Sequence, residues 1–392
     1  MSQFPNWRFS EEDLERAKRV LASNFSGSYG TNYLSELENL WAKYIGTKYA
    51  VGYSSGTTTL HGALHALGVG RGDEVLVPAL NVIMTSNAVV MAGAIPVFVD
   101  VCEDTFCINP EDAAQKMTRK TKAMIPVAFY GQPCDMNWLK DVAVDYDSRV
   151  IEDNAQAVGS LYKGHRLGSI GDIASFSFES SKCIAAGTGG ILTTSDKEYY
   201  DELRSFRFHG YKLTQEVSDP HQAKDIMQDP TYERHEKFGW SYVLPELCAA
   251  VLISQVQRAD WFVQRRVDVS RRYQDAIIDS KADYLIPQVE SKGTLNGRWT
   301  YAVRFIGTLS EWRSFRKQYM KNGGDGIYGC FQVVYNEPVY RNHLVDWKAS
   351  SGHCEVAEKI QPQLMQFANN YGSVEEAELK VEALRKTIKD WR

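Results

Sequence analysis

Short apolar runs alternate with segments of helical periodicity along the first 250 residues of the chain. The apolar runs are rich in β-branched residues and are too short for helices, which predicts strands. They cover residues 48–53, 74–78, 93–100, 121–131 and 148–153. Strands that alternate with helices predict an α/β fold, in which helices flank a mostly parallel sheet.

The pattern changes beyond this region. A long apolar helix is predicted to begin near residue 244 and to lead into a second part of the chain. Strands such as 300–305 then alternate with helices at 310–321 and 373–390, which predicts an α+β arrangement. A chain of 392 residues also exceeds the usual size of one core. We therefore predict a large domain over residues 1–250 and a smaller C-terminal domain over residues 251–392.

The composition is that of an ordinary globular protein, with 44% hydrophobic and 24% charged residues. The net charge of −5 gives no reason to expect a nucleic-acid or membrane partner. The N-terminus has no apolar signal core, and no apolar run is long enough to span a bilayer. Seven scattered cysteines without a Cys-x-x-Cys pair favour reduced thiols, so we expect a cytoplasmic protein.

Lys182 is the first candidate for chemistry. It lies between an alternating aromatic run at 174–178 and a loop with three glycines in its last four positions, 187–190. A loop after a strand often holds a reactive side chain, and a lysine there can act as a Schiff-base nucleophile. Taken alone, a solvated surface lysine is the commoner interpretation.

Two further positions have similar alternatives. The turn that holds Gly56 and Thr57 joins a predicted strand to a helix, where free amides and the helix dipole favour an anion. A capped helix start without a ligand explains the same residues.

Asp153 ends a predicted strand, at the sheet edge where ligands bind in α/β folds. It could equally cap a helix that begins at Asn154.

His61 and His65 are four residues apart on a predicted helix and could face one metal ion. The first has no neighbouring glutamate, so the His-Glu-x-x-His pattern is not met. We expect packing or surface histidines and no metal site.

Four segments together resemble the DegT/DnrJ/EryC1/StrS family of sugar aminotransferases, in the order and spacing of that family. They are Ser-Gly-Thr at 55–57, Ile-Glu-Asp-Asn-Ala-Gln-Ala at 151–157, Gly-Ser-Ile-Gly-Asp at 168–172, and Phe-Ser-Phe-Glu-Ser-Ser-Lys at 176–182 followed by Gly-Gly at 189–190. The resemblance implies the aspartate aminotransferase fold and the cofactor pyridoxal 5'-phosphate (PLP).

The resemblance also implies roles for individual residues. Lys182 would hold PLP as a Schiff base and then serve as general acid and base. Asp153 would pair with the pyridine nitrogen, and Gln156 would lie near the phenolic oxygen. The phosphate would receive the amides of Gly56 and Thr57 and the hydroxyl of Ser177.

Several residues around this site depart from the family pattern. Val82 stands where the family stacks an aromatic side chain on the PLP ring. Ser241 stands where the family has an asparagine that reaches the phosphate of a neighbouring subunit. Cys183 replaces an asparagine, and Thr188 replaces a glutamate.

The resemblance implies transfer of an amino group from an amino acid, with L-glutamate as the expected donor, to a keto sugar that is most often linked to a nucleotide. Alternatives are a non-nucleotide ketone such as a keto-cyclitol, a PLP-dependent deoxysugar dehydratase, and a sensor or scaffold without catalysis. Related dehydratases carry histidine in place of Lys182, which argues against the second. A homodimer with active sites at its interface is implied, and the polar loop 211–236 is expected to close over the substrate.

Overall fold

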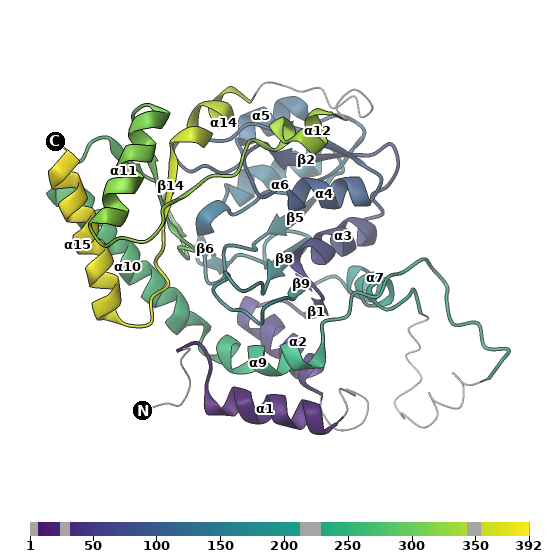
Figure 1. Ribbon diagram of the computed structural model, residues 1–392. Coiled ribbons are helices and arrows are strands. Elements are labelled where there is room, and N and C mark those ends of the chain that lie inside the picture. Colours follow the sequence, from purple (N-terminus) through teal and green to yellow (C-terminus); the bar gives the residue numbers. More distant parts are fainter. Residues whose placement is uncertain (1–6, 24–31, 212–228, 343–353, 392) are drawn as a thin grey trace.

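The computed structural model describes residues 7–23, 32–211, 229–342 and 354–391 (Figure 1). Most of the polar loop 211–236 therefore lies outside the described residues. Figure 1 shows a central sheet surrounded by helices, with the C-terminal helices α10, α11 and α15 gathered at one side.

The first part of the described chain contains nine strands and seven α-helices. In chain order they are α1 (Glu11–Ala22), α2 (Tyr33–Ile45), β1 (Tyr49–Tyr53), α3 (Gly56–Ala66), β2 (Glu74–Pro78), α4 (Met84–Met91), β3 (Ile95–Val99), α5 (Pro110–Lys116), β4 (Thr121–Met124), α6 (Met136–Asp145), β5 (Arg149–Asp153), β6 (Leu161–Tyr162), β7 (His165–Arg166), β8 (Ile173–Ser177), β9 (Gly190–Thr194) and α7 (Lys197–Arg207).

Seven of these strands form the main sheet, in the order β1-β9-β8-β5-β4-β2-β3. Strand β9 runs antiparallel to both of its neighbours, and the other pairs are parallel. The sequence-based prediction of a mostly parallel sheet flanked by helices is confirmed.

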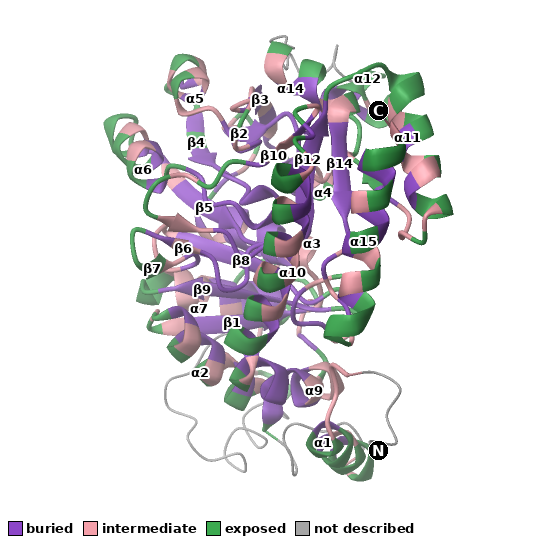
Figure 2. Ribbon diagram, turned by 90° about the vertical axis from the view of Figure 1, so that its left-hand side faces the viewer, coloured by how far each residue is buried: buried purple, intermediate pink, exposed green. Residues whose placement is uncertain are grey.

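Both faces of the main sheet are buried, which explains its near-continuous apolar strands. In β2, Val75 and Val77 pack into the core that α3, α4 and α7 cover, while Leu76 between them packs toward α5 and α6. Figure 2 shows the buried strands in purple between helices whose outer faces are exposed. This two-residue alternation places the ends of the strands, rather than their faces, within reach of a ligand.

The later part of the described chain contains five strands and six α-helices. They are α9 (Glu246–Gln257), α10 (Ala259–Asp279), β10 (Leu285–Pro287), β11 (Thr294–Leu295), β12 (Tyr301–Phe305), α11 (Leu309–Lys321), β13 (Tyr328–Gly329), α12 (Pro338–Arg341), α14 (Glu355–Ile360), β14 (Leu364–Phe367) and α15 (Val374–Trp391).

A second, antiparallel sheet in the order β10-β12-β14-β13 packs with α10, α11 and α15 around its own core. A small sheet of β11, β6 and β7 joins this part to the first. The domain boundary at residue 250 stays a prediction. The expected single long helix is instead two, because the chain leaves helical geometry at Arg258, between α9 and α10.

Candidate active site

Lys182 and Asp153 are brought together by two neighbouring parallel strands. Asp153 is the last residue of β5, and it pairs with Ser175 of β8. Lys182 follows β8 by five residues, in a turn closed by the bond from its amide to the carbonyl of Glu179. Because the carboxyl ends of parallel strands meet at one sheet edge, both side chains reach the same cavity.

This cavity has a volume of about 350 Å³, within the range of small-molecule sites. Seven of the eight residues predicted for the site line it, namely Gly56, Thr57, Val82, Asp153, Gln156, Ser177 and Lys182. Ser241 does not; it is exposed and forms a bridge with Phe208 instead. Its expected contact with a neighbouring subunit stays a prediction.

The N-terminus of α3 forms one wall of the cavity. Ser55 caps the helix, and its hydroxyl accepts from the amide of Thr58 at 3.2 Å. The amides of Gly56 and Thr57 have no acceptor within the helix, as at any helix start. A Cβ atom on Gly56 would lie 2.9 Å from Cβ of Ser177, so only glycine allows the helix this close to β8. Capping by Ser55 therefore does not exclude an anion at these two amides.

Asp153 is a buried carboxylate with an exposed fraction of 5%. The hydroxyl of Thr85 donates to its Oδ2 at 2.8 Å, and the amide of Ala155 donates to its Oδ1 at 3.2 Å. Burial raises its pKa above the usual value, while these two donors and Lys182 act against that shift. Residues 154–159 form turns rather than a helix, so the helix-cap interpretation of Asp153 is wrong.

Gln156 is held by a buried aromatic residue. The amide of Tyr130 donates to Gln156 Oε1 at 2.7 Å, and Tyr130 adopts a left-handed backbone with φ of 58°. This bond engages the side-chain carbonyl of Gln156, which lines the cavity, and leaves its amide nitrogen available as a donor. Such a donor suits an oxygen that carries negative charge.

Lys182 is half-buried, and burial is the main reason that its pKa lies below the usual value. The carboxylates of Asp153 and Glu179 raise the pKa of this lysine, and Arg266 lowers it. A lowered lysine pKa increases the fraction of neutral, nucleophilic amine. The environment of Lys182 therefore favours carbonyl chemistry over a solvated surface role.

Three of the four departures from the family pattern, Val82, Cys183 and Thr188, lie at or behind the cavity. Val82 lines it together with Met84, and its aromatic lining comes from Trp299 and Phe331 in the later part of the chain. Thr188 also lines it and donates to the carbonyl of Ser54 at 2.8 Å. Cys183 is buried behind the lysine, and burial raises the pKa of its thiol.

The sequence did not single out Thr85, Glu179 or Trp299. Thr85 follows Val82 by three residues, and the amide of Thr85 donates to the carbonyl of Val82 at 3.2 Å, so the turn that leads into α4 brings both to the cavity. Glu179 lies inside the motif at residues 176–182, but the family resemblance implied no role for it. Trp299 lies more than a hundred residues from Lys182, and no local pattern connects the two.

The two histidines of α3 pack against aromatic rings. His61 lies edge-on to Phe206 and its Nδ1 is 3.3 Å from the hydroxyl of Tyr242, while His65 stacks on Phe206 at 4.0 Å. Burial lowers the pKa of His61 to about 4. Among the described residues, no group of three or more His, Cys, Asp or Glu side chains could hold a metal ion.

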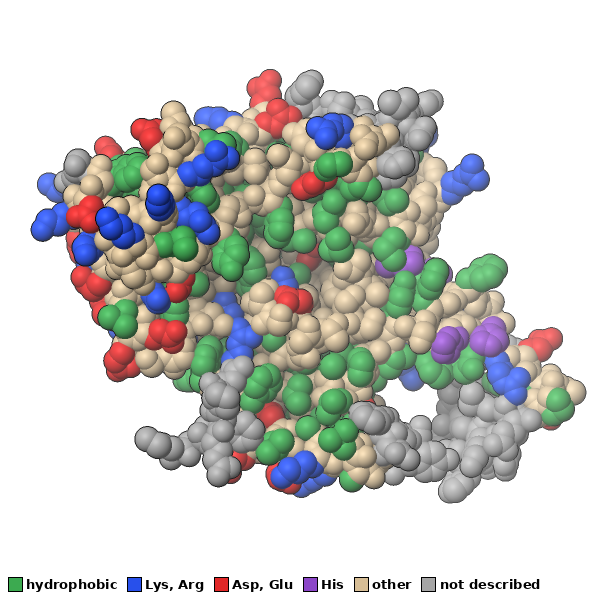
Figure 3. All heavy atoms as spheres, viewed as in Figure 1, with side chains coloured by type: hydrophobic (Ala, Val, Ile, Leu, Met, Phe, Trp, Pro, Cys, Tyr) green, Lys and Arg blue, Asp and Glu red, His purple; other side chains and the backbone are tan. Residues whose placement is uncertain are grey.

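The surface carries no large patch of one charge on the face seen in Figure 3, where basic and acidic side chains mix over α10, α11 and α15. Within the described ranges, no helix is long and apolar enough to cross a membrane.

Comparisons with known proteins agree with this geometry. Residues 8–379 match the model of the DegT/DnrJ/EryC1/StrS aminotransferase family. GDP-perosamine synthase of Escherichia coli O157:H7 is 37% identical over 331 residues, which is 84% of each chain. An aminotransferase structure from Psychrobacter cryohalolentis superposes with a TM-score of 0.89 at 28% identity and covers 99% of both chains. DesV of S. venezuelae, solved with a ketimine intermediate, gives a TM-score of 0.83 at 28% identity over 97% of this chain and 95% of its own. The chain therefore belongs to the DegT/DnrJ/EryC1/StrS aminotransferase family and is a PLP-dependent aminotransferase.

Proposed function

We propose that this enzyme transfers an amino group from L-glutamate to a keto sugar that is carried on a nucleotide. The observation that carries the proposal is the convergence of Lys182, Asp153 and the start of α3 on one cavity. The 37% identical relative is a GDP-perosamine synthase, which supports a nucleotide-linked sugar as the acceptor class. The glutamate donor rests on the family resemblance.

The residues of the cavity fit PLP. Asp153 is buried, and within the described residues it forms no ion pair, so a protonated ring nitrogen would supply the cation that its charge needs. The cradle between Gly56 and Ser177, which a Cβ atom would fill, fits a phosphate at the free amides of α3. When bound, PLP supplies an electron sink for a developing carbanion.

The side chains then have separate tasks. Lys182 would bind the cofactor through Nζ and later hold on the same atom the proton that leaves the α-carbon of the amino-acid substrate. Asp153 would hold a proton on the ring nitrogen, and the bond from Thr85 would keep its carboxylate in the required orientation. Gln156 would donate from its amide nitrogen to the phenolic oxygen of the ring.

We also infer a homodimer with active sites at its interface. The support is the family resemblance and the position of Ser241, which lies outside the cavity of its own chain. Light scattering that measured the mass of a single chain would contradict it.

The function is tested by replacing Lys182 with alanine. We expect Lys182→Ala to lose the visible absorbance of bound PLP and to reduce amino transfer by about 1,000-fold or more, because it removes the group that carries the proton. Turnover is measured by mass spectrometry with glutamate and a set of keto sugars on different nucleotides. Lys122→Ala, which changes an exposed lysine of β4, should behave as wild type.

The same assay separates the alternatives. A PLP-loaded wild-type protein whose spectrum glutamate leaves unchanged would rule out this donor. Amination of free keto-cyclitols in preference to nucleotide-linked sugars would replace the proposed acceptor class.

A further inference from the structure

The indole of Trp299 contacts the lysine turn, residues 179–183, in two ways. Its Nε1–H donates to the carbonyl oxygen of Ser181 at 3.1 Å. Its ring centroid lies 5.0 Å from Nζ of Lys182. An ammonium group at this distance over an indole face is attracted by the negative face of the ring. One side chain therefore contacts both the backbone that carries Lys182 and the reactive end of that lysine.

Trp299 is itself held in place from two sides. Its ring lies parallel to that of the buried Tyr130, with centroids 6.3 Å apart and an angle of 4° between the planes. Its carbonyl accepts from the buried guanidinium of Arg266 at 2.5 Å. Arg266 also approaches the carbonyl of Lys182 at 3.5 Å, so it links Trp299 to the turn a second time.

The carbonyl of Ser180, which comes one residue before that of Ser181, also accepts a hydrogen bond from a distant side chain. Nη1 of Arg8 donates to the carbonyl of Ser180 at 2.8 Å. Three consecutive carbonyls of the turn, those of Ser180, Ser181 and Lys182, thus each meet a side chain from a distant part of the chain. Of these three side chains, which belong to Arg8, Trp299 and Arg266, only that of Trp299 also lines the cavity.

We propose that Trp299 is a positioning residue for Lys182, fixing the lysine turn through its N–H and holding the ammonium form of the lysine on its ring. The inference rests on the proposed role of Lys182 and adds a residue to it. During transfer the lysine must leave the cofactor and return, and the indole gives its free ammonium form a defined place beside the cavity.

The charged groups that face Lys182 set the sign of the expected effect. They are Asp153 from β5, Glu179 from the turn and Arg266 from α10. The two carboxylates raise the pKa of Lys182, while Arg266 and, above all, burial lower it. An indole face stabilises the ammonium form, so its removal should lower the pKa of Lys182 further.

Two variants separate the two contacts. Trp299→Phe keeps an aromatic face but loses the N–H, and Trp299→Leu loses both. Trp312→Phe is the matched control, because Trp312 also donates from Nε1 to a backbone carbonyl, that of Leu364 at 3.3 Å, and does not line the cavity.

The first readout uses the cofactor-free full chain. Pyridoxal is added across a pH series, trapped on lysine with borohydride, and quantified at Lys182 by peptide mass spectrometry. In Trp299→Leu we expect the trapping profile to move to lower pH, with about a fivefold higher rate at pH 7. Trp299→Phe and Trp312→Phe should keep the wild-type profile.

The second readout is turnover of the loaded enzyme. We expect it to fall about fivefold in Trp299→Phe, because the Ser181 carbonyl loses its donor, and further in Trp299→Leu. Trapping that rises while turnover falls is the signature of a positioning residue, since damage to the fold alone would lower both.

Three results would overturn the inference. The first is a pH profile of pyridoxal trapping at Lys182 in Trp299→Leu that has the same midpoint as wild type. The second is turnover in Trp299→Phe that equals that of wild type. If Trp299→Leu does not fold, the turnover of Trp299→Phe decides, since a fivefold fall is expected there and wild-type turnover would overturn the inference. The third is wild-type protein that traps pyridoxal at other lysines but not at Lys182, which would refute the proposed function as well.

Discussion

At the scale of single residues, the site depends on a carboxylate that the fold buries. Asp153 accepts bonds from Thr85 and Ala155 and forms no ion pair within the described part of the chain. Its pKa is raised by burial, which means that ionisation costs free energy in the cofactor-free protein. In the proposed function a cofactor with a cationic nitrogen would recover this cost, so the stability of the cofactor-free protein and the binding of that cofactor would make opposite demands on Asp153.

We therefore expect Asp153→Asn to stabilise the cofactor-free protein while lowering turnover of the loaded enzyme by about 100-fold. Because the pKa of Asp153 is raised in the folded protein, the folded chain binds this proton more tightly than the unfolded chain does. The unfolding free energy of wild type therefore decreases as the pH rises from the pKa of the unfolded chain through that of the folded chain. The gain in unfolding free energy should thus be small at acidic pH, where Asp153 is protonated in the folded chain, and should grow as the pH rises.

Denaturant unfolding followed by circular dichroism at several pH values measures this gain. Asp141→Asn, at an exposed position of α6, is the control and should show no such pH dependence. A cofactor-free Asp153→Asn protein that is less stable than wild type at alkaline pH would contradict the prediction.

At the scale of elements, the start of α3 combines a cap with close packing. Ser55 and Thr58 form a capping box, which satisfies part of the helix end. The hydroxyls of Thr59 and Ser175 are 2.6 Å apart and fix the helix to β8. The absence of a side chain on Gly56 then lets the first amides approach Ser177.

Gly56→Ala should weaken cofactor binding, because its Cβ would displace Ser177 from the first amides of α3. Overpacking of this kind lowers the unfolding free energy by about 1–3 kcal/mol. Gly70→Ala is the matched control, since a Cβ there meets no heavy atom within 4 Å. Fluorescence titration with PLP compares the two, and equal affinities would show that the close approach of α3 does not matter for binding.

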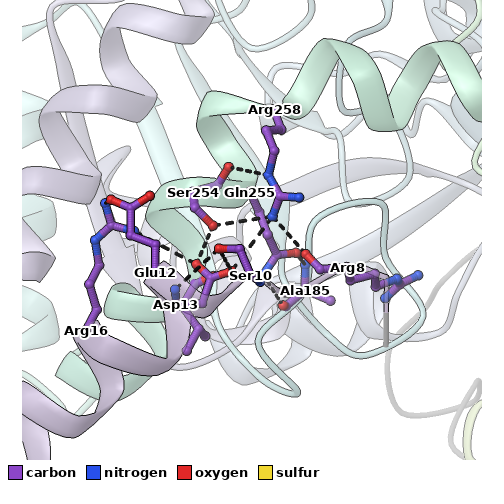
Figure 4. A network of polar contacts seen from close by, with 10 residues as sticks. Arg8, Ser10, Glu12, Asp13, Arg16, Ala185, Ser254, Gln255 and Arg258 are labelled. Carbon is purple, nitrogen blue, oxygen red and sulfur yellow. Dashed lines mark hydrogen bonds and ion pairs between the residues drawn. The ribbon is translucent and has the colours of Figure 1, made fainter. Parts of the chain in front are cut away.

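At the scale of the whole molecule, a polar network connects α1 to α9 and, through α9, to Ala185, which follows the lysine turn by two residues (Figure 4). The buried carboxylate of Asp13 accepts from Ser10 in α1's capping box and from the hydroxyl of Ser254 in α9. From the same helix, Gln255 exchanges two hydrogen bonds with the backbone of Ala185, at 3.1 and 2.9 Å. Arg258 continues the network to the carbonyl of Arg8 at 2.9 Å.

Asp13→Ala should therefore affect a distant part of the site. Loss of this carboxylate leaves buried donors unpaired and should lower the unfolding free energy by about 3 kcal/mol. Hydrogen exchange should also increase at residues 180–186, because α9 and Arg8 both hold that segment.

The control is Glu15→Ala on the exposed face of α1, where the partner is Lys18. Glu15→Ala should leave both the unfolding free energy and the hydrogen exchange of residues 180–186 unchanged. Increased exchange in α1 alone, with no increase at residues 180–186, would show that the network does not couple α1 to this segment.

The elements were predictable wherever their signals are local. The strands predicted at 74–78 and 148–153 form as β2 and β5, and the helices predicted at 310–321 and 373–390 form as α11 and α15. The break at Arg258 was not predictable, because the apolar pattern continues across it. The site required more than periodicity, since only a resemblance to a family connected Lys182 with Asp153 and Gly56.

The sequence by itself determined the alternation of strands and helices, the parallel sheet that follows from it, and the family to which its motifs point. These depend on residues close together in the chain, whose spacing is fixed by helix and strand geometry. Only the tertiary structure decided that Thr85 orients Asp153, that Tyr130 orients Gln156 and that Trp299 lies against Lys182. Such contacts join residues far apart in sequence, and they exist only after the sheet edge and the C-terminal part have packed together.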